Sequence, residues 1–250
     1  MVSAWYYNET EEDQRALHKY EPSQDVSLDE LAKLGVLHWT FDPETELDKV
    51  NELSKERCYF SRDEISISKE TLPNYEEKLK IFFTEHIHED EEIRYVLSGS
   101  GYFDIRNKDD RWIRIHTKKG DMIILPAGSY HRFTLDDTNF IKAMRLFKED
   151  PKWTPINRSE KTDSNQHRLS YLETISGKRA ADTDPECNLS GKKLKSLVGE
   201  SVDVDPIHTQ SEPAPGDTKE AEPTLKKAVI ETVKSVDVVE TPANIAVTEE

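Results

Sequence analysis

Basic residues and long apolar runs are scarce in this chain of 250 residues. The 34 Lys and Arg are outnumbered by 50 Asp and Glu, which gives a formal net charge of -16. Binding to a nucleic-acid backbone needs clustered basic side chains, so we expect no nucleic-acid partner. No apolar run approaches the roughly 20 residues that cross a bilayer, and the N-terminus lacks the regions of a signal peptide. We therefore expect a cytoplasmic protein with no membrane partner.

Cysteines are also scarce: Cys58 and Cys187 are the only two. Two cysteines cannot form the framework of several bridges that stabilises small secreted domains, and Cys187 lies in a strongly polar region. We therefore expect both thiols to stay reduced, as in an intracellular compartment.

Aromatic residues are nearly absent from the last part of the chain, where Tyr171 is the only one after Trp153. From about residue 176 acidic, polar and proline residues accumulate, and the short apolar groups are too isolated to offset the entropy of ordering. The composition predicts a folded domain over residues 1–175 and a disordered, acidic, proline-containing tail over residues 176–250.

Two short basic pieces interrupt the predicted tail. Lys178-Arg179 and Lys192-Lys193-Leu194-Lys195 are spaced like the halves of a bipartite nuclear-import signal. Most charge runs are merely solvated chain. We therefore expect the nucleus only as a second location beside the cytoplasm.

The first third of the sequence carries the signals of short helices, namely capping boxes and apolar residues at helical spacing. These signals predict a helix from Ser27 to Gly35 and a helix through Leu47, Val50 and Leu53. They also predict a helix beginning at Ser61-Arg62-Asp63-Glu64 and another from about Pro73 to Phe82. Between the first two helices, residues 36–41 are predicted to form a strand.

From Thr84 the pattern changes to short runs separated by turn residues, which is typical of β-structure. The runs predict strands over 86–89, 93–97, 102–106, 112–116, 122–125, 131–135 and 141–147, with turns between them, including one at Ser98-Gly99-Ser100-Gly101. With no long helices between them, such strands favour an antiparallel meander that closes into a sandwich or barrel. The predicted fold is mainly β, with N-terminal helices.

Three histidines and one carboxylate have the spacing of a metal site. His86 and His88 share a face only on an extended strand, where side chains alternate with period 2. A turn then allows Glu92 to begin the next strand, and His131 must come from a neighbouring strand. Imidazole and carboxylate ligands without thiolates suit iron(II), nickel, manganese, cobalt or zinc. The sequence thus predicts a mononuclear metal site.

Composition alone leaves one ligand open, because Glu89, Asp90 or Glu91 could take the place of Glu92. Alternation along the strand puts Glu92, Arg94 and Val96 on one face, so that a metal ligand, a cation and an apolar wall would share one cavity.

Four protein ligands on an octahedral ion leave two open positions, which suit a bidentate oxygen ligand such as an enediol. Arg94 could stabilise the anionic form of such a substrate, or it could form a structural ion pair. The candidates for an apolar substrate-binding wall, each of which could equally be ordinary core, are Phe82, Val96, Phe103 and Phe133.

These residues match a known family. His86-x-His88-x3-Glu92-x6-Gly99 and Gly120-x5-Pro126-x-Gly128-x2-His131 resemble the paired cupin motifs, with Leu135 where many cupins carry Asn. Roughly residues 1 to 165 closely resemble the acireductone dioxygenases of methionine salvage. The stretches that carry this resemblance include Ala4-Trp5-Tyr6, Leu72-Pro73-Asn74-Tyr75, Glu92-Ile93-Arg94-Tyr95, Tyr130-His131-Arg132-Phe133 and Lys142-Ala143-Met144-Arg145-Leu146-Phe147.

The resemblance implies a specific chemistry and a cupin-type barrel. In that family the positions matching His86, His88, Glu92 and His131 hold one divalent ion, and the substrates are acireductone (1,2-dihydroxy-3-keto-5-methylthiopentene) and O2. With iron(II), Fe(2+), the products are formate and 4-methylthio-2-oxobutanoate. With nickel, Ni(2+), off-pathway cleavage gives formate, CO and 3-methylthiopropanoate.

Two other functions stay open at this point. A metal-dependent cupin isomerase would turn over its substrate without consuming oxygen. Alternatively, the domain could be a metal-stabilised scaffold in a protein whose acidic tail recruits partners. We expect the protein to be a monomer.

Overall fold

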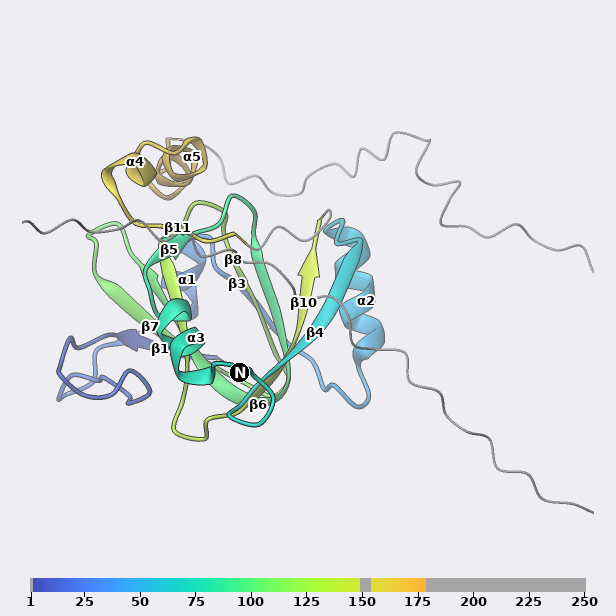
Figure 1. Ribbon diagram of the computed structural model, residues 1–250. Coiled ribbons are helices and arrows are strands. Elements are labelled where there is room, and N and C mark those ends of the chain that lie inside the picture. Colours follow the sequence, from blue (N-terminus) through green and yellow to red (C-terminus); the bar gives the residue numbers. More distant parts are fainter. Residues whose placement is uncertain (1, 149–153, 179–250) are drawn as a thin grey trace, which may run out of the picture. The chain divides into compact units, whose positions relative to one another are not determined.

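The computed structural model describes residues 2–148 and 154–178, and the main feature of this part is a set of antiparallel strands (Figure 1). The strands are β1 (Ser3–Tyr6), β2 (Asp25–Val26), β3 (Leu37–Thr40), β4 (Ser61–Ile67), β5 (His86–Ile87), β6 (Glu92–Arg106), β7 (Trp112–Lys118), β8 (Asp121–Leu125), β9 (His131–Leu135), β10 (Ile141–Phe147) and β11 (Ile156–Asn157). The helices are α1 (Leu28–Lys33), α2 (Leu47–Glu56), α3 (Tyr75–Phe82), α4 (Glu160–Asp163) and α5 (Gln166–Ile175). The predicted mainly β class is confirmed.

Strand β6 connects the two sides of the barrel. Its first part, residues 92–99, pairs with β8 and β10, whereas its second part, residues 100–106, pairs with β7 and β9. All of these pairings are antiparallel, as predicted. The strands do not form a simple meander, however, because β8, β9 and β10 each pair with β6. One long strand thus brings residues from both sides of the barrel to the same interior.

The turn predicted at residues 98–101 is wrong, because β6 continues through it. Gly99 has a φ of 75°, and an added Cβ would lie 2.2 Å from the Phe140 carbonyl oxygen. The register with β10 also shifts between Lys142 and Ala143. Glycine at a bulge bends a strand without ending it, so the two predicted strands are one.

The helices predicted from Ser27 and from residues near Leu47 and Pro73 are confirmed as α1, α2 and α3. The capping box of α1 is complete: Glu30 N donates to Ser27 Oγ at 3.2 Å, and Ser27 N donates to Glu30 Oε2 at 2.9 Å. The strand predicted over residues 36–41 is confirmed as β3.

The helix predicted to begin at Ser61 is wrong, because residues 61–67 form strand β4. All seven of these residues pair with β10, from Ser61 opposite Phe147 to Ile67 opposite Ile141. A capping box is a local preference of modest strength, and the ladder with β10 outweighs it.

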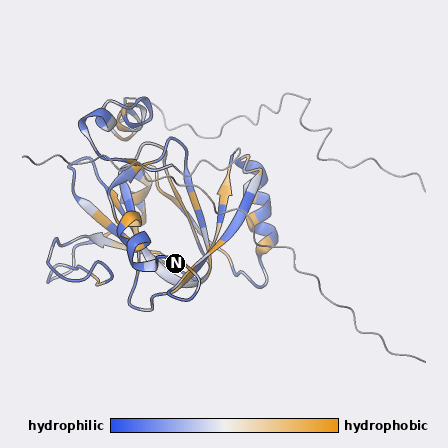
Figure 2. Cartoon of the chain, in the orientation of Figure 1, coloured by the Kyte–Doolittle hydropathy of each residue, from blue (hydrophilic) through white to orange (hydrophobic). Residues whose placement is uncertain are grey.

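Each longer helix packs against strands through its apolar face. Leu31 of α1 joins a core cluster that includes Phe103 and Ile105. Val50 of α2 belongs to a second cluster, and α3 contributes Tyr75 and Leu79 to a third that contains Val96. Most of the exposed residues on these helices are polar, although Leu47 of α2 and Ile81 of α3 are exposed as well, and each helix carries both kinds of residue (Figure 2). The helices therefore pack against the barrel, and the end of α3 also contributes Ile81 and Phe82 to the lining of its pocket.

The predictions for the tail and for the cysteines involve residues that the structure does not fully describe. The predicted tail lies outside the described residues apart from 176–178, so its disorder and the boundary at residue 175 stay predictions. The prediction of two reduced thiols is not supported, since Cys58 takes part in a disulfide and Cys187 lies outside the described residues. Among the described helices, none has the length and apolar character of a membrane span.

Candidate metal centre

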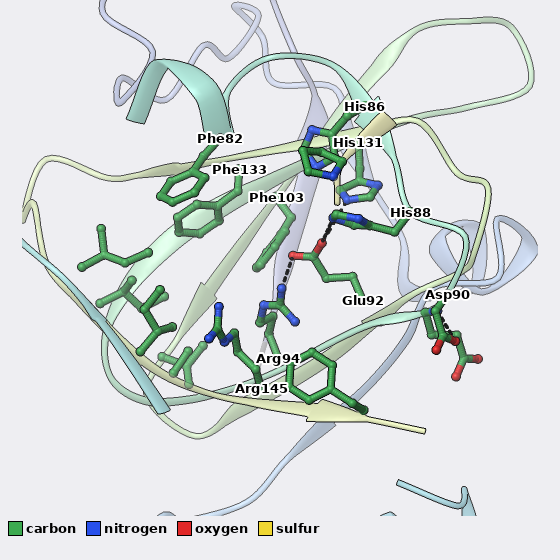
Figure 3. A pocket seen from close by; sticks show the side chains of 18 of the residues that line it. Phe82, His86, His88, Asp90, Glu92, Arg94, Phe103, His131, Phe133 and Arg145 are labelled. Carbon is green, nitrogen blue, oxygen red and sulfur yellow. Dashed lines mark hydrogen bonds and ion pairs between the residues drawn. The ribbon is translucent and has the colours of Figure 1, made fainter. Parts of the chain in front are cut away.

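The structure brings together the side chains predicted as metal ligands, namely His86, His88, Glu92 and His131 (Figure 3). Each offers one ligand atom, and these atoms all lie within 4.8 Å of one another. His86 and His131 lie directly opposite each other on β5 and β9, while Glu92 is the first residue of β6. Three of the four are buried, and His88 is partly exposed. One small cation can therefore contact all four groups.

The acidic residues near the histidines differ in their contacts. Glu91 pairs with Arg57 at 3.3 Å and with Lys148 at 3.0 Å, and Glu89 accepts a hydrogen bond from Asn165. Of the acidic residues from 89 to 92, Glu92 is the one that joins the histidines.

Backbone carbonyls orient two of the imidazoles. His86 Nδ1 lies 2.6 Å from the Thr84 carbonyl oxygen, and His131 Nδ1 lies 2.9 Å from that of Ser129. A carbonyl oxygen only accepts, so each Nδ1 carries the proton and each Nε2 keeps a free lone pair. His131 Nε2 lies 3.1 Å from Glu92 Oε2, which shows that this lone pair is directed into the site.

The charge states also favour a cation. Burial, reinforced by the neighbouring His131, lowers the pKa of His86 to about 3, so this imidazole is neutral at physiological pH. Burial alone would raise the pKa of Glu92, but the nearby Arg94 guanidinium, together with the contacts of the carboxylate with His131 and His88, outweighs it and holds the pKa of the carboxyl well below its usual range. Neutral imidazoles and an ionised carboxylate are the forms that bind metals.

Two arginines border the ligand cluster. Arg94 Nη2 lies 3.3 Å from Glu92 Oε1, and the Arg94 side chain lines the pocket, as predicted. Arg145 is directly opposite Arg94 on β10 and forms a two-bond ion pair with Asp63 at 2.7 and 2.8 Å. Arg145 was not among the predicted site residues. Its signal was the alternation along β10, where Ile141, Ala143 and Arg145 all line the pocket.

The residues predicted as apolar walls all line the same pocket, whose volume is about 280 Å³. The Phe133 ring centroid lies 4.9 Å from that of Phe103 and 6.4 Å from that of Phe82, and Val96 is fully buried. Figure 3 shows these rings on one side of the pocket and the histidines with Glu92 on the other. Ile65 and Ile67 of β4 also line the pocket. They were missed because that segment was predicted as helical.

An antiparallel barrel that holds three imidazoles and one carboxylate beside an apolar pocket defines a metal-dependent enzyme of the cupin class. The profile of one such family, described as "ARD/ARD' family", matches residues 3–155, which is more than half of the chain. The chain therefore belongs to the ARD/ARD' family.

Individual relatives agree. The chain is 53% identical over 180 residues to "Acireductone dioxygenase" of Monodelphis domestica, covering 71% of this chain and 99% of the relative. It is 55% identical over 176 residues to "Acireductone dioxygenase 1" of Physcomitrium patens, covering 70% and 90%.

A solved structure supports both the fold and the use of a metal. It is "Acireductone dioxygenase from Bacillus anthracis with cadmium ion in active center", which matches with a TM-score of 0.51 and 25% sequence identity. The match covers 62% of this chain and 98% of that chain. Together with the His and Glu cluster, this likeness indicates that the present chain has a metal cofactor.

Proposed function

We propose that this chain is a dioxygenase that cleaves acireductone with O2 to formate and 4-methylthio-2-oxobutanoate, with iron(II) as its cofactor. We further propose that nickel redirects the same substrate to formate, CO and 3-methylthiopropanoate. The observation that carries the proposal is the convergence of His86, His88, Glu92 and His131 at one end of an apolar pocket, in a chain whose relatives carry the name acireductone dioxygenase.

The donor set fits a divalent ion. The side chains of His86, His88, Glu92 and His131 supply three neutral donors and one negative charge, so a bound divalent ion would keep a net positive charge. When bound, the ion supplies Lewis acidity towards the oxygens of the substrate.

Arg94 supplies the second positive charge at this end of the pocket. Its side chain is only 18% exposed, so a hydrogen bond to an anionic substrate oxygen would be partly shielded from water. Burial lowers the pKa of Arg94 and the contact with Glu92 opposes this effect. A guanidinium is basic enough to stay charged in proteins. Arg94 can therefore hold the enediolate in its ionised form.

The apolar end of the pocket fixes the orientation of the substrate. Phe82, Phe103 and Phe133 form a wall that suits a methylthioalkyl chain, since burying apolar surface is favourable and no polar group there needs a partner. A volume of about 280 Å³ suits a small molecule. The substrate thus enters with its oxygens towards Glu92 and its sulfur towards the phenyl rings.

The test is anaerobic mixing of substrate with the iron-loaded protein, followed by addition of oxygen in an oxygen electrode. We expect one O2 consumed per substrate, with formate and the oxo acid as products, and no reaction in metal-free protein. Turnover without oxygen uptake would instead identify the isomerase. No turnover by fully loaded protein would favour the scaffold.

We also propose a monomeric protein of the cytoplasm with a second location in the nucleus. The acidic composition and the two basic pieces near residues 178 and 192 support this proposal. Size-exclusion chromatography with light scattering tests the first part, and fluorescence microscopy of the tagged full chain tests the second.

A further inference from the structure

Residues 154–178 pass beside the strand that carries His86. Strand β11 pairs with β5, with Ile156 opposite Ile87 and Asn157 opposite His86. On its other side, β5 pairs with β9 at a single position, His86 opposite His131. A strand of two residues has little stability of its own. Strand β11 pairs with both residues of β5, whereas β9 pairs with His86 alone.

The residue before His86 is fixed by the same segment. Arg158 N donates to the Glu85 carbonyl oxygen at 3.0 Å, and Arg158 Nη1 donates to Glu85 Oε1 at 2.8 Å. The Arg158 guanidinium is held in turn by Asp110 at 2.9 and 3.0 Å, and Arg106 donates to the same Glu85 carboxylate at 3.1 and 3.2 Å. This network of paired charges gives Glu85 one defined position.

The residue before His131 is fixed as well. Tyr130 is fully buried, and its hydroxyl donates to Asp163 Oδ1 of α4 at 2.7 Å. Its ring lies 4.7 Å from the Arg158 guanidinium and 4.3 Å from that of Arg168. The C-terminal segment therefore contacts the chain next to a second histidine of the cluster.

The third histidine is held through a loop. The His88 carbonyl oxygen accepts from Gly128 N at 2.9 Å, and the Gly128 carbonyl oxygen accepts from Arg168 Nη1 at 3.3 Å. Asn165 Nδ2 donates to Glu89 Oε1, beside His88, at 3.1 Å. All three histidines are thus linked, through a neighbouring residue or loop, to residues 156–168.

We propose that residues 156–168 position the histidine ligands, and that Arg158 is the positioning residue for His86 through Glu85. The inference rests on the proposed function, because it takes these histidines to bind the ion. The family profile ends at residue 155, so the match assigns no role to this segment. Residues that surround metal ligands and orient them typically contribute about 10- to 100-fold to metal affinity.

The test is calorimetric titration of metal-free, full-length protein with Ni2+, comparing wild type with Arg158→Ala. The matched control is Arg15→Ala, because Arg15 also forms a two-bond ion pair, with Asp13 at 2.8 and 2.9 Å, and has a similar exposure of 26% against 32% for Arg158. Arg15 does not line the pocket. We expect Arg158→Ala to weaken Ni2+ binding about 10- to 100-fold. Arg15→Ala should leave it unchanged.

Absorption spectra of the Co2+-loaded proteins separate positioning from general stability. Arg158→Ala should change the ligand-field bands, and Arg158→Lys, which can keep the contact with Glu85, should restore part of the wild-type spectrum and affinity. If Arg158→Ala does not fold, Glu85→Gln is compared in the same way. Wild-type affinity and an unchanged spectrum in the folded variant would overturn the inference and leave the proposed function intact. Failure of the wild type to bind Ni2+ would overturn the proposed function itself, and this inference with it.

Discussion

Replacing Arg94 with methionine tests the central electrostatic argument. Methionine keeps the unbranched side chain but removes the charge that lies 3.3 Å from Glu92 Oε1 inside the pocket. A hydrogen bond to a charged group contributes about 1.5 to 3 kcal/mol. If Arg94 makes this bond to the enediolate in the transition state, Arg94→Met should lower kcat/KM roughly 10- to 150-fold.

The assay is stopped-flow mixing of iron-loaded enzyme and anaerobic substrate with oxygenated buffer, with the metal content of each sample measured in parallel. This second measurement matters because Arg94 is the strongest influence that lowers the pKa of Glu92, so its loss raises that pKa. Arg94→Lys is the matched variant, and it should recover part of the rate because it keeps the charge and loses only the planar fork. The reasoning is refuted if Arg94→Met, with one iron per chain, keeps the wild-type kcat/KM.

Three further predictions follow from the site and the core. His131→Ala and Glu92→Ala should lower metal content and oxygen consumption together, and full metal content with full turnover in either variant would refute the ligand assignment. Deletion of all residues after 178 should leave oxygen consumption unchanged, because the sequence predicts the catalytic domain to end near residue 175; an inactive but folded deletion variant would show that this boundary is misplaced. Arg114→Met should destabilise the domain by about 3 kcal/mol, because Arg114 is fully buried and its Nε donates to the buried Asp104 at 2.7 Å. The corresponding drop in Tm is about 6 to 12 °C, and calorimetry showing no drop would contradict the role of this ion pair.

The ligand set could be predicted because strand alternation is a local rule. His86 and His88, one residue apart, need only an extended backbone to share a face, and the same rule puts Glu92 and Arg94 on one face. The helices α1 to α3 could be predicted in the same way, because their caps and apolar spacing lie within each segment.

What could not be predicted depends on pairing across long distances in the chain. Whether Ser61 begins a helix or a strand is decided by the ladder with β10, far away in the sequence. Arg145 meets Arg94 only through the register of two strands, and Arg158 meets Glu85 across 73 residues. No local pattern encodes such a pairing, so the second arginine and the C-terminal support of the metal centre emerge only in three dimensions.

Two strands of the barrel, β4 and β5, pair with strands that come much later in the chain, so their pairing is delayed while the protein is synthesised. Within the described residues β4 pairs only with β10. Its ladder can therefore be completed only after Phe147, the last residue of β10, has left the ribosome. Strand β5 gains its second neighbour only after Asn157. Until then, the nascent chain exposes strand edges that can pair with other chains. The release of Phe147 and then of Asn157 therefore marks the points in synthesis at which these edges can be covered.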